Sequence, residues 1–143
     1  MRAPVLLVGY DAAAVRRTRD DFISGGLTNP VLACEDGHEA AAYVLGRAPY
    51  AERADHPLPV VLVTALRLPL GSAADVLRVL RADAGLRRLP VVVTGGDPGD
   101  DEIAVLHQHG ATYLSGHVAS RALLDVIRGL HLPWALERAD PVA

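Results

Sequence analysis

The stretch Leu58-Pro59-Val60-Val61-Leu62-Val63-Thr64-Ala65-Leu66-Arg67-Leu68-Pro69 decides the fold of this 143-residue chain. It is a short apolar run bounded by prolines, which predicts a central strand buried on both faces of a parallel sheet. In a doubly wound α/β domain, functional residues gather beyond the carboxyl ends of the central strands. Here that end carries Ala65, whose methyl side chain can carry out no chemistry.

Strand-like and helix-like segments alternate along the rest of the chain. Further apolar runs predict four strands, at residues 5–8, 30–34, 90–94 and 112–114. Five helices are predicted at residues 12–23, 38–45, 73–82, 100–109 and 120–131, with Asp11 and Ser72 as N-caps of the first and third. This alternation predicts an α/β fold, a doubly wound five-stranded parallel sheet with five helices on its two faces.

A single domain is predicted for residues 1–143, because half of the residues are apolar and can form one core. Pro133 suits the first turn of a helix, so residues 133–139 are predicted to form a short C-terminal helical extension. The first residues do not resemble a signal peptide, and no segment reaches the ~20 apolar residues of a membrane span. We therefore expect a cytoplasmic protein with no membrane partner.

Charge and residue usage exclude several classes of function. The formal net charge of -3 argues against direct binding to nucleic acid, which normally needs a basic face. The chain contains no lysine, so a mechanism that needs a lysine amine is excluded. Cys34 is the only cysteine, which excludes an internal disulfide and a cysteine-rich zinc site. We expect Cys34 to be a buried apolar residue.

A series of short stretches resembles the receiver domain of bacterial response regulators, and more narrowly the stand-alone receivers associated with phytochrome-type sensor kinases. The resemblance covers nearly the whole chain. It implies the flavodoxin-like receiver fold and a role in two-component signal transduction. It is carried by Leu6-Leu7-Val8, by residues 26–31, by residues 36–44, by Tyr50-Ala51, by Leu66-Arg67-Leu68-Pro69, by residues 79–83 and 89–93, by Gly110-Ala111 and by Trp134.

The resemblance also implies a phosphorylation pocket. In that family two acidic residues hold Mg²⁺, an aspartate accepts a phosphoryl group from a histidine kinase, and a threonine or serine and a lysine contact the phosphoryl oxygens. Arg67 falls where a backbone carbonyl would contact the metal, and Asp11 is the one acidic neighbour of the altered acidic pair. By position, the five side-chain roles fall on Gly9, Tyr10, Ala65, Gly95 and Gly116.

These replacements predict an aspartate-less receiver, or pseudo-receiver. Phosphoryl transfer depends on positioning and on charge neutralisation by a metal ion and a cation. Ala65 cannot be a nucleophile, and Asp11 alone is a poor site for Mg²⁺, which needs several hard oxygen ligands. Arg67 would repel Mg²⁺, and we expect it to pair with Asp11 in the place of the metal. We therefore expect no catalytic residue, no metal ion and no cofactor.

Two threonines could substitute for the missing groups. Thr64 precedes Ala65, and because neighbours on a strand alternate between faces, we expect its side chain to point away from the pocket. Thr94 lies one position before Gly95, and we expect an ordinary strand threonine that does not act as a switch.

Two other features could suggest a binding site, but we favour a purely structural interpretation of each. His107 and His109 are two residues apart, so they do not share a helix face and are not expected to bind a metal. The loop at residues 95–99 is rich in glycine but lacks the ending of a P-loop, so we expect a flexible loop, with small-ligand contact as the weaker alternative.

Two functions are left open. The first is a non-enzymatic, phosphorylation-independent module for protein–protein interaction, with a sensor kinase or a downstream signalling protein as partner. The second is a small-metabolite sensor that uses the vacated acidic pocket.

A homodimer is also expected, through the face formed by residues 100–109, 112–114 and 120–131. Leu124 lies about 100° from the inward stripe of its helix, which is weak support for a contact surface. The resemblance implies dimers too, because related stand-alone receivers look dimeric. The residues expected on this dimer or partner face are Leu124, Arg128, His131, Trp134 and Leu136.

Overall fold

The computed structural model describes residues 3–116, 123, 125, 126 and 129, and contains the predicted five-stranded parallel sheet. The strand order is β2-β1-β3-β6-β7. β3 pairs with β1 on one side and with β6 on the other, so the strand predicted to be central is central. The bounds are β1 (Val5–Val8), β2 (Val31–Cys34), β3 (Val61–Ala65), β6 (Val91–Thr94) and β7 (Thr112–Leu114).

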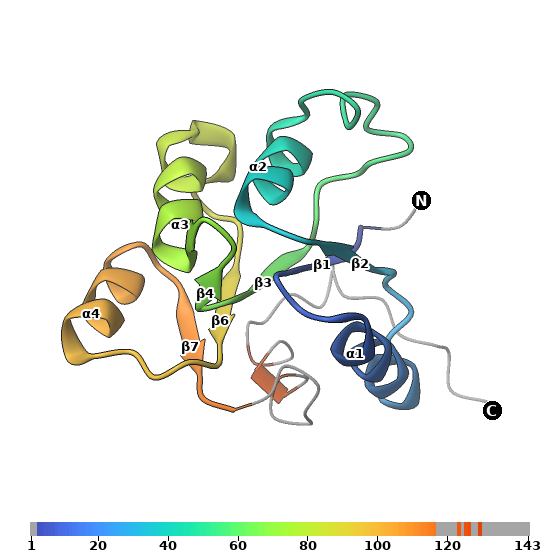
Figure 1. Cartoon of the computed structure of the whole chain (residues 1–143). Coiled ribbons are helices and arrows are strands. Elements are labelled where there is room, and N and C mark those ends of the chain that lie inside the picture. The colour runs from blue at the N-terminus through green and yellow to red at the C-terminus, as the bar shows by residue number, and fades with distance from the viewer. Residues whose placement is uncertain (1–2, 117–122, 124, 127–128, 130–143) are drawn as a thin grey trace.

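Four helices accompany the sheet in the described part of the chain, and they lie on both of its faces (Figure 1). Of the predicted helix at 120–131, the structure describes Leu123, Asp125, Val126 and Gly129, all in helical conformation. The rest of that helix and the predicted extension at 133–139 lie outside the described residues. The bounds are α1 (Ala12–Ser24), α2 (Gly37–Leu45), α3 (Ala73–Ala82) and α4 (Asp100–Gln108), with a short 3-10 turn at Ala84–Leu86.

Successive side chains along each strand point to opposite faces of the sheet, so the core has two layers. On β3, Leu62 contributes to the layer under α2, α3 and α4, whereas Val61 and Val63 contribute to the layer under α1. Leu123 lies fully buried in this second layer. Because both faces of the sheet are covered, its strands are apolar without a polar face, as the opening stretch predicted.

The predicted helix starts are confirmed. The Asp11 carboxylate accepts a hydrogen bond from the backbone N–H of Ala14 at 2.7 Å, which caps α1. At the start of α3, the Ser72 backbone N–H donates to Asp75 at 3.0 Å. The residues of α3 that face the core are spaced as on one side of a helix and are buried: Ala73, Val76, Leu77 and Leu80.

A small hairpin between β3 and α3 was not predicted. β4 (Arg67–Leu68) pairs antiparallel with β5 (Gly71–Ser72) around a two-residue turn. Pro69 suits the first central position of such a turn, and Leu70 takes the second with φ 63°. A strand of two residues has no periodic pattern, so the sequence carries no signal for it.

In the part of the chain that the structure describes, no helix is long and apolar enough to cross a membrane.

Candidate functional site

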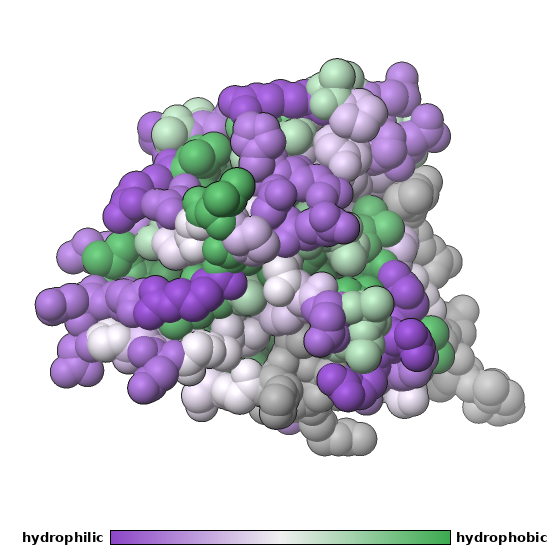
Figure 2. Space-filling model, viewed as in Figure 1, coloured by the Kyte–Doolittle hydropathy of each residue, from purple (hydrophilic) through white to green (hydrophobic). Residues whose placement is uncertain are grey.

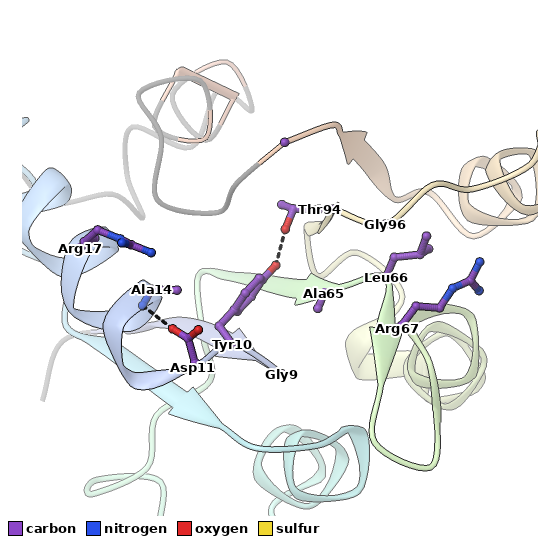
Figure 3. A pocket seen from close by; sticks show the side chains of 12 residues that line it. Gly9, Tyr10, Asp11, Ala14, Arg17, Ala65, Leu66, Arg67, Thr94 and Gly96 are labelled. Carbon is purple, nitrogen blue, oxygen red and sulfur yellow. Dashed lines mark hydrogen bonds between the residues drawn. The ribbon is translucent and has the colours of Figure 1, made fainter.

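A cleft of about 710 Å³ lies at the carboxyl edge of the sheet, where β1, β3 and β6 end (Figure 3). The end of the central strand contributes only the methyl group of Ala65. The lining brings together all seven positions of the altered pocket: Gly9, Tyr10, Asp11, Ala65, Arg67, Gly95 and Gly116. The same lining contains five residues for which no site role was predicted: Ala14, Arg17, Leu66, Thr94 and Gly96.

A hydrogen bond crosses this cleft from Tyr10 to Thr94. The Tyr10 hydroxyl lies 2.7 Å from Thr94 Oγ1, and Figure 3 shows the tyrosine ring extending from the β1–α1 loop toward the end of β6. Burial raises the pKa of Tyr10, although the Thr94 hydrogen bond acts in the opposite direction, so the phenol stays protonated. Thr94 is the last residue of strand β6, as predicted, and its hydroxyl also takes part in this hydrogen bond at the cleft, which was not predicted.

Gly9 is held by its backbone conformation and its surroundings. Its φ is +83°, a conformation that L side chains rarely adopt, and a Cβ placed there would clash with the Leu68 side chain. The same Cβ would lie 3.5 Å from Cβ of Ala65. A carboxylate at this position would therefore need a different loop conformation and a different position for Leu68.

Arg67 does not pair with Asp11, so that prediction is also wrong. Its guanidinium donates two hydrogen bonds to the Glu102 carboxylate, at 2.5 and 2.7 Å, and joins the β4–β5 hairpin to the first turn of α4. Asp11 instead caps α1. The helix N-terminus satisfies Asp11 locally, which leaves Arg67 to the nearer carboxylate on α4.

The other residues considered in the sequence do not contribute to the cleft. Thr64 is fully buried, is absent from the cleft lining, and donates to the Ala65 carbonyl at 3.0 Å. Cys34 is buried as predicted, and burial raises the pKa of its thiol to about 12, so the thiol is inert. Among residues 3–116 and the few described beyond them, no three His, Cys, Asp or Glu side chains are grouped to hold a metal ion.

The sequence contains a usable signal for only one of the missed residues. Thr94 is the register partner of Ala65 across β3 and β6, so its side chain lies on the same side of the sheet. Aligning the predicted strands by their ends would have placed it at the pocket. Glu102 lies 35 residues beyond Arg67 on another element, and no local pattern connects the two. The five residues predicted for a dimer or partner face, Leu124, Arg128, His131, Trp134 and Leu136, lie outside the described residues.

The known proteins that this chain resembles include several response regulators. The response regulator Rcp1 of Synechocystis sp. PCC 6803 is 26% identical over 131 residues, which are 91% of this chain and 87% of Rcp1. The bacteriophytochrome response regulator RtBRR has a TM-score of 0.79 at 25% identity, over 99% of this chain and 85% of that one. The phosphorylated cyanobacterial phytochrome response regulator RcpA has a TM-score of 0.75 at 24% identity, over 94% of each chain.

This chain has the fold of a response-regulator receiver domain. Its similarity to phytochrome-associated response regulators supports the narrower resemblance seen in the sequence. No model of a protein family matches the chain.

The cleft at the carboxyl edge of this sheet does not fit a Mg²⁺ ion. Mg²⁺ is held by carboxylates and waters in octahedral geometry. Among the described residues that line the cleft there is one carboxylate, Asp11, which caps α1, and there are two guanidinium groups, Arg17 and Arg67. No acceptor carboxylate stands at Ala65. We therefore derive no metal-dependent step from this site.

Proposed function

We propose that this receiver domain is a phosphorylation-independent, non-enzymatic module for protein–protein interaction in signal transduction. The observation that carries the proposal is the end of β3, where Ala65 offers a methyl group to the cleft. Phosphoryl transfer to a receiver needs an acceptor oxygen and a metal to neutralise charge. The described residues of the cleft supply neither at the receiver positions, so a signal must pass through contacts with other proteins.

Mass spectrometry tests whether the chain is independent of phosphorylation. The purified chain is incubated with acetyl phosphate and Mg²⁺, and its intact mass is measured beside a receiver that retains its aspartate. The control should gain one phosphoryl group, and this chain should gain none. A stoichiometric gain by this chain would contradict the proposal.

The partners that we propose are a sensor kinase or a downstream signalling protein. The matched receivers include response regulators of phytochromes and a bacteriophytochrome, which supports a sensor of that class as the first candidate. Cross-linking in native cells, followed by identification of the captured proteins, tests this. Recovery of neither a kinase nor another signalling protein would count against it.

We also propose a constitutive homodimer through α4, β7 and the segment 120–131, in a single-domain cytoplasmic protein with a helical extension at 133–139. No phosphoryl group triggers association in this proposal, so the dimer should persist without ligand. Sedimentation at micromolar concentration should show a dimer that Leu124→Glu weakens. A monomer, or a dimer that Leu124→Glu leaves intact, would exclude this face.

A small-metabolite sensor is the second candidate function, because the cleft has room for a small molecule. Its volume of about 710 Å³ lies within the roughly 300–1,000 Å³ range of small-molecule sites. Tyr10 and Arg67 line this space without filling it. Native mass spectrometry of the protein purified from its own cells distinguishes the candidates: a bound small molecule favours the sensor, and the bare chain mass favours the interaction module.

A further inference from the structure

We propose that Tyr10 and Thr94 form a built-in lock across the vacated pocket. The lock joins the β1–α1 loop to the end of β6 and holds the cleft in one state without a phosphoryl group or a ligand. This inference rests on the proposed function, because a lock in place of a phosphoryl group has meaning only where no phosphoryl group is transferred.

The lock connects two strands that are not neighbours. Tyr10 follows β1, Thr94 is the last residue of β6, and β3 lies between these strands in the sheet. The hydrogen bond of 2.7 Å therefore passes across the end of β3 and joins residues 84 positions apart. Tyr10, Thr94 and Ala65 all line this cleft (Figure 3), so the bond crosses the same cleft that an aspartate at position 65 would face.

Burial makes this bond costly to break. Thr94 is 2% exposed, and its hydroxyl shares one hydrogen bond with the hydroxyl of Tyr10, in which either group can be the donor. A buried hydroxyl that loses its partner is left without the water that would replace it. Separation of the β1–α1 loop from β6 would therefore leave an unsatisfied hydroxyl at the end of β6, and the joined state is favoured.

The residues next to the bridge carry no charged side chain. Gly95 follows Thr94, and a Cβ placed there would meet nothing nearer than the backbone oxygen of Gly116 at 3.8 Å. Ala65 lines the same cleft with a methyl group. An aspartate at position 65 would instead put a carboxylate into the cleft that the Tyr10–Thr94 bond crosses.

Hydrogen exchange measured by mass spectrometry tests the lock in the whole chain. Tyr10→Phe keeps the ring and removes the hydroxyl, and Thr94→Val keeps the shape and removes the partner. Each variant should speed exchange of the backbone amides of residues 9–11, 95–97 and 99 about fivefold, which is the factor that corresponds to a net hydrogen bond of about 1 kcal/mol. The double variant should show the same increase as either single variant, because both remove one bond.

Tyr43→Phe is the matched control. Its hydroxyl donates to the carbonyl of Pro57 at 2.9 Å, away from the cleft, so this variant should leave exchange at 95–99 unchanged. If Tyr10→Phe changes exchange at 95–99 no more than Tyr43→Phe does, there is no lock. Additive effects in the double variant would also overturn it. A gain of phosphate in the acetyl phosphate experiment would overturn the proposed function and leave this exchange result standing as a separate fact.

A second measurement needs no variant. The ¹³C chemical shift of Tyr10 Cζ in the wild-type chain reports directly on ionisation of the phenol. Tyr10 should remain protonated at pH 11, where an exposed tyrosine is ionised. Ionisation near pH 10 would show that the hydroxyl is open to water, and the lock would be excluded.

Discussion

Arg67 and Glu102 form a two-pronged ion pair that ties the β4–β5 hairpin to the first turn of α4. The Arg67 side chain is 59% exposed and the Glu102 side chain 38%, so water and salt weaken the pair. Its two parallel hydrogen bonds nevertheless define one geometry for the start of α4. The pair thus joins Arg67, which lines the cleft, to the first turn of α4.

This pair should contribute to stability in a pH-dependent way. Hydrogen bonds from Arg67 hold the pKa of Glu102 below its ordinary value of 4.5. A carboxyl group with a lowered folded-state pKa contributes stability above its ordinary pKa, and the contribution is lost as pH falls through the lowered value. Arg67→Gln should therefore lower the urea midpoint slightly at pH 7, and the difference from wild type should vanish in acid.

The matched control for that prediction is Arg78→Gln, which breaks the pair of Arg78 with Asp75 on α3. It should leave exchange at the start of α4 unchanged, whereas Arg67→Gln should increase it. A midpoint difference for Arg67→Gln that is the same at pH 7 and in strong acid would contradict the electrostatic explanation.

An aspartate introduced at position 65 should not be enough to permit phosphorylation. Ala65→Asp supplies an oxygen at the end of β3, but Gly9 and Tyr10 still offer no carboxylate to hold Mg²⁺. Intact mass after treatment with acetyl phosphate and Mg²⁺ should show no added phosphoryl group. Ala65→Asn serves as the control for size. Stoichiometric phosphorylation of Ala65→Asp would show that the cleft still binds the metal.

Gly9→Ala should destabilise the fold. The residue at this position has φ +83°, and an added Cβ would clash with Leu68. The left-handed backbone costs roughly 1–2 kcal/mol for an L residue, and the forced movement of Leu68 adds to that cost. We expect a loss of about 2–3 kcal/mol in the free energy of unfolding, measured in urea. Gly99→Ala, where a Cβ would meet nothing within 4 Å, should change stability far less.

Leu70→Asn should stabilise the fold. Leu70 has φ 63° at the tip of the β4–β5 hairpin, and its side chain is fully exposed, so its replacement removes no packing. Asparagine adopts this left-handed conformation more readily than leucine does. The free energy of unfolding should rise by roughly 0.5–1 kcal/mol. Val79→Asn, at another exposed apolar residue but inside a helix, should not raise it.

The fold was predictable from the sequence because its signals are local. Strand β3 is apolar and lies between prolines, and Asp11 and Ser72 mark the starts of two helices. Apolar runs must be buried and helix ends must be capped, whatever the rest of the chain does. For the same reason, the sequence could place Ala65, which has no reactive group, at the end of the central strand.

The partners inside the cleft depended on the tertiary structure. Five oxygen-bearing or charged side chains line the cleft with Ala65: Tyr10, Asp11, Arg17, Arg67 and Thr94. Reasoning from the sequence paired Arg67 with Asp11 and left Thr94 without a role. In the folded chain Arg67 reaches Glu102 on α4, and Tyr10 reaches Thr94 across β3. These are contacts between groups 35 and 84 residues apart, at distances of 2.5–2.7 Å. A hydrogen bond fails when atoms shift by less than an ångström. Sequence patterns assign a residue to an element and a face, and only the packing of those elements brings particular atoms within that range.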